Sequence, residues 1–256
     1  MASIKVMTFN LRVDNTGDGI NSFTNRRERV LDMLAATNPD IIGFQECTHH
    51  MRAYLEAHMP AYAFVGCGRE RNYQGESMAI AFRKQSFAVV SIENFWLTAT
   101  PRIAGSTLGG DQSACPRMAT IAVLYGFEAG KEICVCNTHL DHQGPIARQI
   151  EAALLCAKLD LYSQPVILTG DMNAEPDAPE IGMIKTAMLV RGACDMTAHV
   201  GGTFHNFGRI SPDRYAKIDY IFTSGQCTHC AVIPDDADKQ GLYYSDHFAI
   251  MAELEL

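Results

Sequence analysis

The sequence predicts a sheet-rich α/β domain, and three observations support this fold class. Ten short apolar or β-branched runs alternate with loops, whereas only three segments show helical periodicity. No internal repeat, low-complexity tract or linker divides the chain. Its 256 residues, 47% of them hydrophobic, suffice to bury a substantial core. We therefore predict a single domain, residues 1–256, in which helices cover the faces of the sheets.

The predicted strands are short runs rich in β-branched and aromatic residues, each bounded by turn-forming residues. In chain order they are Ile4–Asn10, Ile41–Gln45, Tyr62–Val65, Met78–Phe82, Phe87–Phe95, Ala119–Tyr125, Ile133–Thr138, Val166–Thr169, Ile218–Phe222 and Phe248–Ala252. Apolar residues at helical spacing predict three helices. These helices are Asn25–Ala36, Met51–His58 and Pro145–Leu161.

The net charge and the cysteine content indicate which ligands and which cellular compartment the protein is suited to. The formal net charge of −8 and the absence of a Lys/Arg run argue against a duplex-wrapping protein. The start "MASIKVMTFN" lacks the features of a signal peptide, and no apolar run reaches the length of a membrane span. Nine cysteines without a framework spacing indicate reduced thiols, so we expect a cytoplasmic protein. Cys227 and Cys230 have metal-like spacing, but a zinc site would need further ligands.

Polar side chains stand at the ends of six predicted strands. Singly, each such ending fits an ordinary turn. Together they predict that carboxylate, amide and imidazole groups converge on one face of the domain. The stretches are "KVMTFN", "DIIGFQE", "ICVCNTH", "VILTGDMN", "KIDYIF" and "YYSDHF".

The residue types in these stretches favour a hard cation. Oxygen ligands from Asn, Asp and Glu suit Mg²⁺ or Mn²⁺ better than zinc, and clustered carboxylates repel one another without a cation. The histidines remain for proton transfer and anion binding. This set of groups is typical of metal-assisted attack of water on a phosphoester.

In order along the chain, these motifs resemble the endonuclease/exonuclease/phosphatase superfamily, which includes DNase I. The stretches "FWLTATPRIAGS", "NTHLDHQGPIARQ" and "GGTFHNFG" are similar to small bacterial members of its nocturnin and carbon-catabolite-repressor branch. The resemblance implies a four-layer α/β sandwich, with two mixed sheets packed face to face and helices outside.

The resemblance also implies roles for individual residues. Metal would be bound by Asn10, Glu46 and Asp246. Catalysis would depend on His139, Asp171, Asn173, Asp219 and His247. In this scheme Asp171 orients or deprotonates the attacking water, and Asp219 orients His247. The cofactor would be Mg²⁺ or Mn²⁺.

Residues outside the motifs are candidates for substrate binding. Arg117 and Arg148 could hold a second phosphate or form ion pairs, and Trp96 and His205 could stack on a base or sugar or belong to the core. Glu76 fits either a pocket or a solvated loop, the latter being our expectation for the mixed-charge stretch 69–76.

We expect a phosphoesterase acting on a nucleotide, a short single-stranded nucleic acid or a phosphorylated small molecule, with no membrane and no obligate protein partner. Two alternatives remain open. One is a catalytically inactive binding module on the same fold, although no position of the core motif set is substituted. The other is a DNA-acting endonuclease, which the acidic net charge disfavours.

Overall fold

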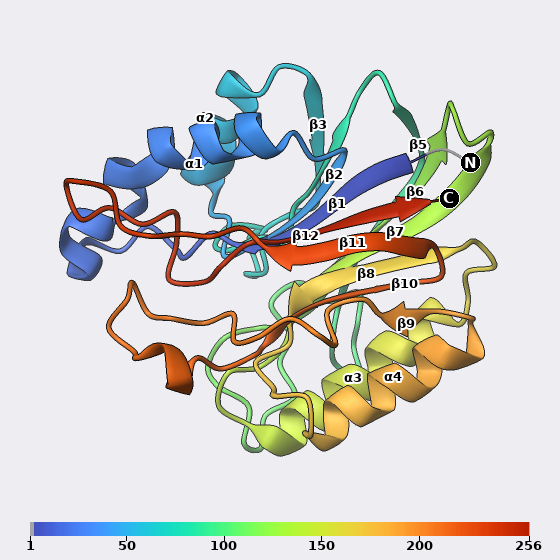
Figure 1. Cartoon of the computed structure of the whole chain (residues 1–256). Helices are drawn as coiled ribbons and strands as arrows, with labels where there is room; N and C mark the ends of the chain where they lie inside the picture. The colour runs from blue at the N-terminus through green and yellow to red at the C-terminus, as the bar shows by residue number, and fades with distance from the viewer. Residues whose placement is uncertain (1–2, 256) are drawn as a thin grey trace.

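Two mixed six-stranded sheets pack face to face in the computed structural model, which describes residues 3–255 (Figure 1). The first sheet has the order β11 (Gln226–Val232), β12 (Ile250–Glu255), β1 (Ser3–Asn10), β2 (Ile41–Gln45), β4 (Ile80–Arg83) and β3 (Tyr62–Val65). The second has the order β5 (Phe87–Trp96), β6 (Met118–Gly126), β7 (Lys131–His139), β8 (Val166–Asp171), β10 (Asp219–Thr223) and β9 (Cys194–Asp195).

Helices cover the outer face of each sheet. Helices α1 (Phe23–Thr37) and α2 (His49–His58) lie on the first sheet, and α3 (Pro145–Leu159) and α4 (Pro179–Val190) lie on the second (Figure 1). Two short 3₁₀ helices, η1 (Thr16–Asn21) and η2 (Pro212–Arg214), lie in the loops. The predicted four-layer α/β sandwich is therefore confirmed.

Three elements were absent from the sequence prediction: α4, β9 and β11. In α4 the buried residues Ile181, Ile184 and Met188 alternate with exposed apolar residues such as Leu189 and Val190. Because both faces are apolar, the helical period is hidden. Strand β11 is a polar edge strand, and β9 has only two residues. The predicted strand Phe248–Ala252 begins two residues later, since β12 spans Ile250–Glu255.

The side chains between the two sheets change from aliphatic to polar along the strands. At one end it is aliphatic, with buried side chains from both sheets such as Val6, Ile41, Val135 and Ile167. Toward the opposite end it becomes polar. There the two sheets are joined through Asn137, whose Nδ2 donates to the carbonyls of Phe44 (2.8 Å) and Ala79 (3.1 Å). Gln45 Nε2 donates to Asn137 Oδ1 at 2.7 Å.

No helix within residues 3–255 is long and apolar enough to cross a bilayer. All nine cysteines carry free thiols. Cys227 and Cys230 lie on β11, and neither belongs to a grouping of possible metal ligands among the described residues.

We predict that Gly43→Ala destabilises the protein by about 1–3 kcal/mol. A Cβ at this β2 position would lie 2.7 Å from Asn137 Oδ1 and would also collide with Thr169 Oγ1. Asn137 cannot retreat without breaking its bonds to the first sheet. Urea unfolding measures the effect.

Gly182→Ala is the matched control for this substitution. Gly182 lies on the exposed side of α4, and an added Cβ meets no atom within 4 Å. It should stabilise the protein by about 0.5–1 kcal/mol through helix propensity. Equal effects of the two substitutions would contradict the tight contact between the sheets at Gly43.

Candidate active site

The sheet register brings the polar strand ends together. Asn10 and Gln45 are partners at the ends of the parallel strands β1 and β2. His139 and Asp171 are partners at the ends of the parallel strands β7 and β8. Strand β10 runs antiparallel to β8, so its first residue, Asp219, lies opposite Asp171. The structure thus places these groups at one edge of the sandwich.

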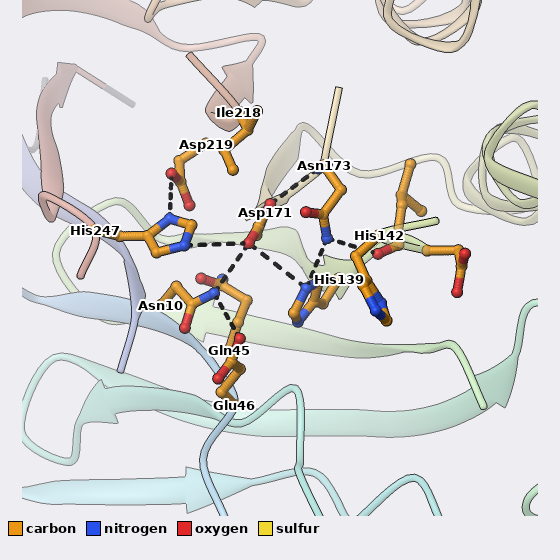
Figure 2. Close-up of polar contacts among 12 residues, drawn as sticks. Asn10, Gln45, Glu46, His139, His142, Asp171, Asn173, Ile218, Asp219 and His247 are labelled. Atoms are coloured by element: carbon orange, nitrogen blue, oxygen red, sulfur yellow. Dashed lines mark hydrogen bonds and ion pairs between the residues drawn. The ribbon is translucent and has the colours of Figure 1, made fainter. Parts of the chain in front are cut away.

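Asp171 is the centre of the hydrogen-bond network at this edge (Figure 2). It is 1% exposed, and its Oδ2 accepts from Asn10 Nδ2 at 2.9 Å. The same oxygen lies 3.5 Å from His139 Nε2 and 3.8 Å from His247 Nε2. Burial, and then the negative charge of Asp219, raise the pKa of Asp171 to about 7. Asp171 therefore exchanges a proton near neutral pH.

His247 is held in its protonated form. Its Nδ1 lies 2.9 Å from Asp219 Oδ2, and Thr203 Oγ1 donates to that oxygen at 2.6 Å. Burial disfavours the imidazolium, but the charges of Asp219, Asp171 and Asp246 outweigh it and raise the pKa of His247 to about 10. His247 is therefore a cation beside Asp171 at neutral pH.

His139 is in the opposite state. Burial, together with the charges of Arg117 and Arg69, holds the pKa of His139 well below its usual range. Asn173 Nδ2 donates to His139 Nε2 at 2.9 Å and to the Leu140 carbonyl at 3.0 Å. Asn173 has a φ of 47°, a left-handed conformation that Asn tolerates better than most residues. The site thus has a neutral and a cationic imidazole on either side of one carboxyl group.

Carboxylates beside this network could hold a cation. One ligand atom each from Glu46, Glu76 and His139 lie within 4.8 Å of one another. Burial, and then the charge of Glu46, raise the pKa of Glu76 to about 6. A bound cation would relieve this repulsion, so the residues fit a divalent metal ion.

This grouping differs from the metal ligands expected from the sequence. Asn10 directs its Nδ2 toward Glu46 Oε1 at 3.2 Å, while its Oδ1 accepts from the Arg12 backbone N–H. The amide oxygen therefore does not face Glu46. Asp246 lines the same pocket as Glu46, and Arg12 Nε lies 3.7 Å from Asp246 Oδ2.

A second grouping of possible ligands consists of Asp171, Asp219 and His247. Here the imidazolium of His247 already supplies a positive charge between the two carboxyl groups. This grouping therefore has less need of a cation than the one around Glu46.

A cavity of about 390 Å³ opens at this edge of the sandwich. Its lining is mainly charged or polar, with a few apolar side chains. The lining residues are Arg12, Val13, Glu46, Arg69, Glu76, Cys115, Arg117, His139, His142, Asp171, Asn173, Phe204, Asn206, Ile218, Asp246 and His247.

The structure does not bring the two aromatic residues predicted to contact substrate to the cavity. Trp96 is 3% exposed and donates its indole N–H to the Arg69 carbonyl at 2.7 Å. His205 is 1% exposed and stacks on Phe248, with ring centroids 4.2 Å apart. Neither side chain lines the cavity, because both are packed into the protein interior.

The two arginines predicted to bind phosphate lie in different places. Arg148 Nε donates to Glu180 Oε1 at 2.6 Å and does not line the cavity, which is the ion-pair alternative given above. Arg117 does line the cavity. The sequence analysis missed Arg69, because the stretch 69–76 has the mixed charges of a solvated loop, yet Arg69 and Glu76 form an ion pair at 2.7 Å inside the cavity wall.

Solved structures with similar folds come from several organisms. An endonuclease/exonuclease/phosphatase from Bacteroides vulgatus is 31% identical, with full coverage of both chains and a TM-score of 0.91. A mannosyl-6-phosphatase from Bacteroides thetaiotaomicron is 28% identical over 99% of this chain and all of that chain, with a TM-score of 0.88. The human nocturnin catalytic domain is 20% identical over 99% of this chain and 93% of its own, with a TM-score of 0.74, a likeness of fold alone.

The family model described as "Endonuclease/Exonuclease/phosphatase family" matches residues 7–247, which include all the polar strand-end residues from Asn10 to His247. The match therefore agrees with the fold and with the residues gathered at the edge of the sandwich. The chain belongs to the endonuclease/exonuclease/phosphatase family of hydrolytic enzymes.

Proposed function

We propose that this protein is a divalent-metal-dependent phosphatase that removes phosphate from a small phosphorylated molecule. One observation carries the proposal: Asp171, whose pKa is raised to about 7, lies between a neutral and a cationic histidine in a small cavity with neighbouring carboxylates. A base that titrates near neutral pH suits general-base catalysis at that pH.

The size of the cavity supports a small substrate. Its volume of about 390 Å³ lies within the range typical of small-molecule sites. The net charge of −8 disfavours long polyanions. The similar protein from Bacteroides thetaiotaomicron is named a mannosyl-6-phosphatase, so a phosphorylated sugar is the first substrate to examine.

Glu46 and Glu76, with Asp246 nearby, would hold the metal ion. When bound, Mg²⁺ or Mn²⁺ supplies positive charge that polarises the phosphoryl oxygens. The carboxylates would also become less repulsive toward an anionic substrate.

The chain's own residues then position water and move its proton. Asp171 accepts a proton from water as the water oxygen forms the new P–O bond. The ester P–O bond breaks, and the departing oxygen takes up a proton from solvent to leave as an alcohol. Asn10 and Asn173 hold the Asp171 carboxyl group through hydrogen bonds of 2.9 Å to each of its two oxygens. The imidazolium of His247 stabilises the charge that develops on the phosphoryl oxygens. His139 contacts the same phosphoryl group as a neutral imidazole.

A substrate screen tests the proposed function directly. Mannose 6-phosphate should release inorganic phosphate in the presence of Mg²⁺ or Mn²⁺, and EDTA should abolish the release. Full activity after exhaustive chelation would contradict the metal requirement. Faster turnover of a short single-stranded oligonucleotide than of any phosphomonoester would favour a nuclease instead.

We predict that Glu46→Gln raises the metal concentration needed for half-maximal activity by at least about tenfold, since it removes a charge that binds a hard cation. Metal should also raise the melting temperature of the wild type more than that of the variant. Glu128→Gln, at an exposed position, is the charge-matched control. Equal metal dependence in the two variants would exclude Glu46 as a ligand.

Asp171→Asn should lower kcat by roughly 10²–10⁴ while the protein stays folded, because an amide cannot accept the proton of water. Asp177→Asn, six residues along the chain and exposed, should keep wild-type kcat. Steady-state kinetics and circular dichroism provide the comparison. Our assignment of the base fails if both variants lose activity equally, or if neither does.

Asp219→Asn should move the pH–rate profile toward lower pH. His247 must be protonated, so wild-type activity should fall as pH rises through its pKa of about 10. Removing the charge of Asp219 lowers this pKa, and it also lowers the pKa of Asp171. Activity rises with pH through the pKa of Asp171 and falls through the pKa of His247. Both limbs of the profile should therefore shift to lower pH by about one unit or more. An alkaline limb unchanged from that of Asp177→Asn would contradict the His247–Asp219 coupling.

A further inference from the structure

Three arginines, Arg12, Arg69 and Arg117, line the cavity. Arg12 Nε lies 3.7 Å from Asp246 Oδ2, and Asp246 precedes His247 in the chain. Arg69 and Arg117 line the cavity together with His139 and His142, and Arg117 Nη2 lies 2.7 Å from His142 Nδ1. Neither Arg69 nor Arg117 belongs to the network around Asp171, whose contacts are Asn10, Asn173, His139 and His247.

Arg69 is fixed in place but incompletely paired. It is 6% exposed, and its Nη2 donates to Glu76 Oε1 at 2.7 Å. Its backbone carbonyl accepts from the Trp96 indole, and its backbone N–H donates to the Glu76 carbonyl at 3.0 Å. Its Nε and Nη1 are buried and have no hydrogen-bond partner, although Glu70 Oε1 lies 3.9 Å from the Nε. A guanidinium has five N–H donors, so most of those of Arg69 are unused.

Arg117 is held in a similar way. It is 2% exposed; its Nε lies 3.4 Å from Asp141 Oδ2, and its Nη2 contacts His142 Nδ1 at 2.7 Å. Asp141 is itself anchored, because it accepts from the backbone N–H groups of Ser113 and Gly144. Arg117 Nη1 is buried without a partner.

A fully structural arginine in the same protein provides the contrast. Arg26 is also buried, but its three nitrogens donate to the carbonyls of Asn21, Leu11, Arg12 and Tyr244. Buried N–H groups without partners are costly, and native proteins rarely leave them so. Arg29 and Arg191 also have a buried Nε without a partner, but neither lines the cavity, whereas Arg69 and Arg117 do. At the cavity wall a bound ligand can supply the missing acceptors.

We propose that Arg69 and Arg117, with His142, form a subsite for a second phosphate group on the substrate. This inference rests on the proposed function and specifies it: the substrate is a phosphate ester with two phosphate groups. One phosphate lies at Asp171 and is hydrolysed, while the other is held by the two arginines. Guanidinium groups suit this role because they bind phosphate through paired N–H donors.

Kinetics on two matched sugars test the subsite. Mannose 1,6-bisphosphate should have a kcat/KM at least about tenfold higher than mannose 6-phosphate with the wild-type protein, because charge-assisted bonds to phosphate are strong. Arg69→Met and Arg117→Met should each raise KM for the bisphosphate by about tenfold, and the preference should fall toward one. Arg69→Lys and Arg117→Lys should keep part of the preference for the bisphosphate, since lysine retains the positive charge but lacks the paired N–H donors of a guanidinium group.

Arg191→Met is the matched control, because Arg191 also has a buried Nε without a partner but lies beside Tyr162 and Gln164, at the opposite end of β8. This substitution should leave the preference for mannose 1,6-bisphosphate over mannose 6-phosphate unchanged.

The dinucleotide pTpT distinguishes the source of the second phosphate. If the arginine variants impair pTpT cleavage and not turnover of the sugar bisphosphate, the subsite binds the next phosphate of an oligonucleotide.

Calorimetry separates this inference from the proposed function. Titration of the Asp171→Asn protein with each sugar phosphate measures binding without turnover, and the bisphosphate should bind about tenfold more tightly. If no phosphoester is hydrolysed but this difference holds, the proposed function fails and the subsite stands. Equal kcat/KM and equal binding of the two sugars, or a preference that survives in both methionine variants, would overturn the subsite.

Discussion

Asn137 holds the two sheets in the alignment on which the site depends. Its side chain comes from β7 of the second sheet and donates to two backbone carbonyls, those of Phe44 and Ala79, on the side of the first sheet. Its oxygen accepts from Gln45 and Thr169. The site takes residues from both sheets, so a displacement of one sheet along the other would separate its halves. A polar bridge with directional bonds prevents this displacement better than aliphatic contacts can, because hydrophobic packing is not directional.

The chemistry of the site comes from giving identical side chains different surroundings. Two histidines lie within 4 Å of the same carboxylate oxygen, yet one is neutral and the other cationic. His139 has arginines near it and no carboxylate bonded to its ring, whereas His247 is bonded to Asp219. Asp171 lies between them and titrates near neutral pH. One network can therefore accept a proton and stabilise an anion at the same pH.

The loops that carry these groups are anchored behind the cavity. Arg26 of α1 joins the segment after β1 to the segment before β12 by donating to the carbonyls of Leu11 and Tyr244. Ser245 Oγ donates to the Asn10 carbonyl at 2.7 Å, which connects the same two segments directly. These bonds keep Asp246 and His247 beside β1, although more than 230 residues of chain separate them from it. A preformed site of this kind loses less entropy when it binds a substrate.

The sequence by itself determined the class of the fold, the strands that end in polar groups and the residues of the family motifs. These features are local, because strand periodicity and turn chemistry act over a few residues. Tertiary structure decided which other residues reach the cavity. Arg69 and Glu76 looked like parts of a solvated loop but are brought together inside its wall, whereas Trp96 and His205 are packed away from it. Burial and pairing depend on contacts between segments distant in the chain, and a local pattern does not contain those contacts.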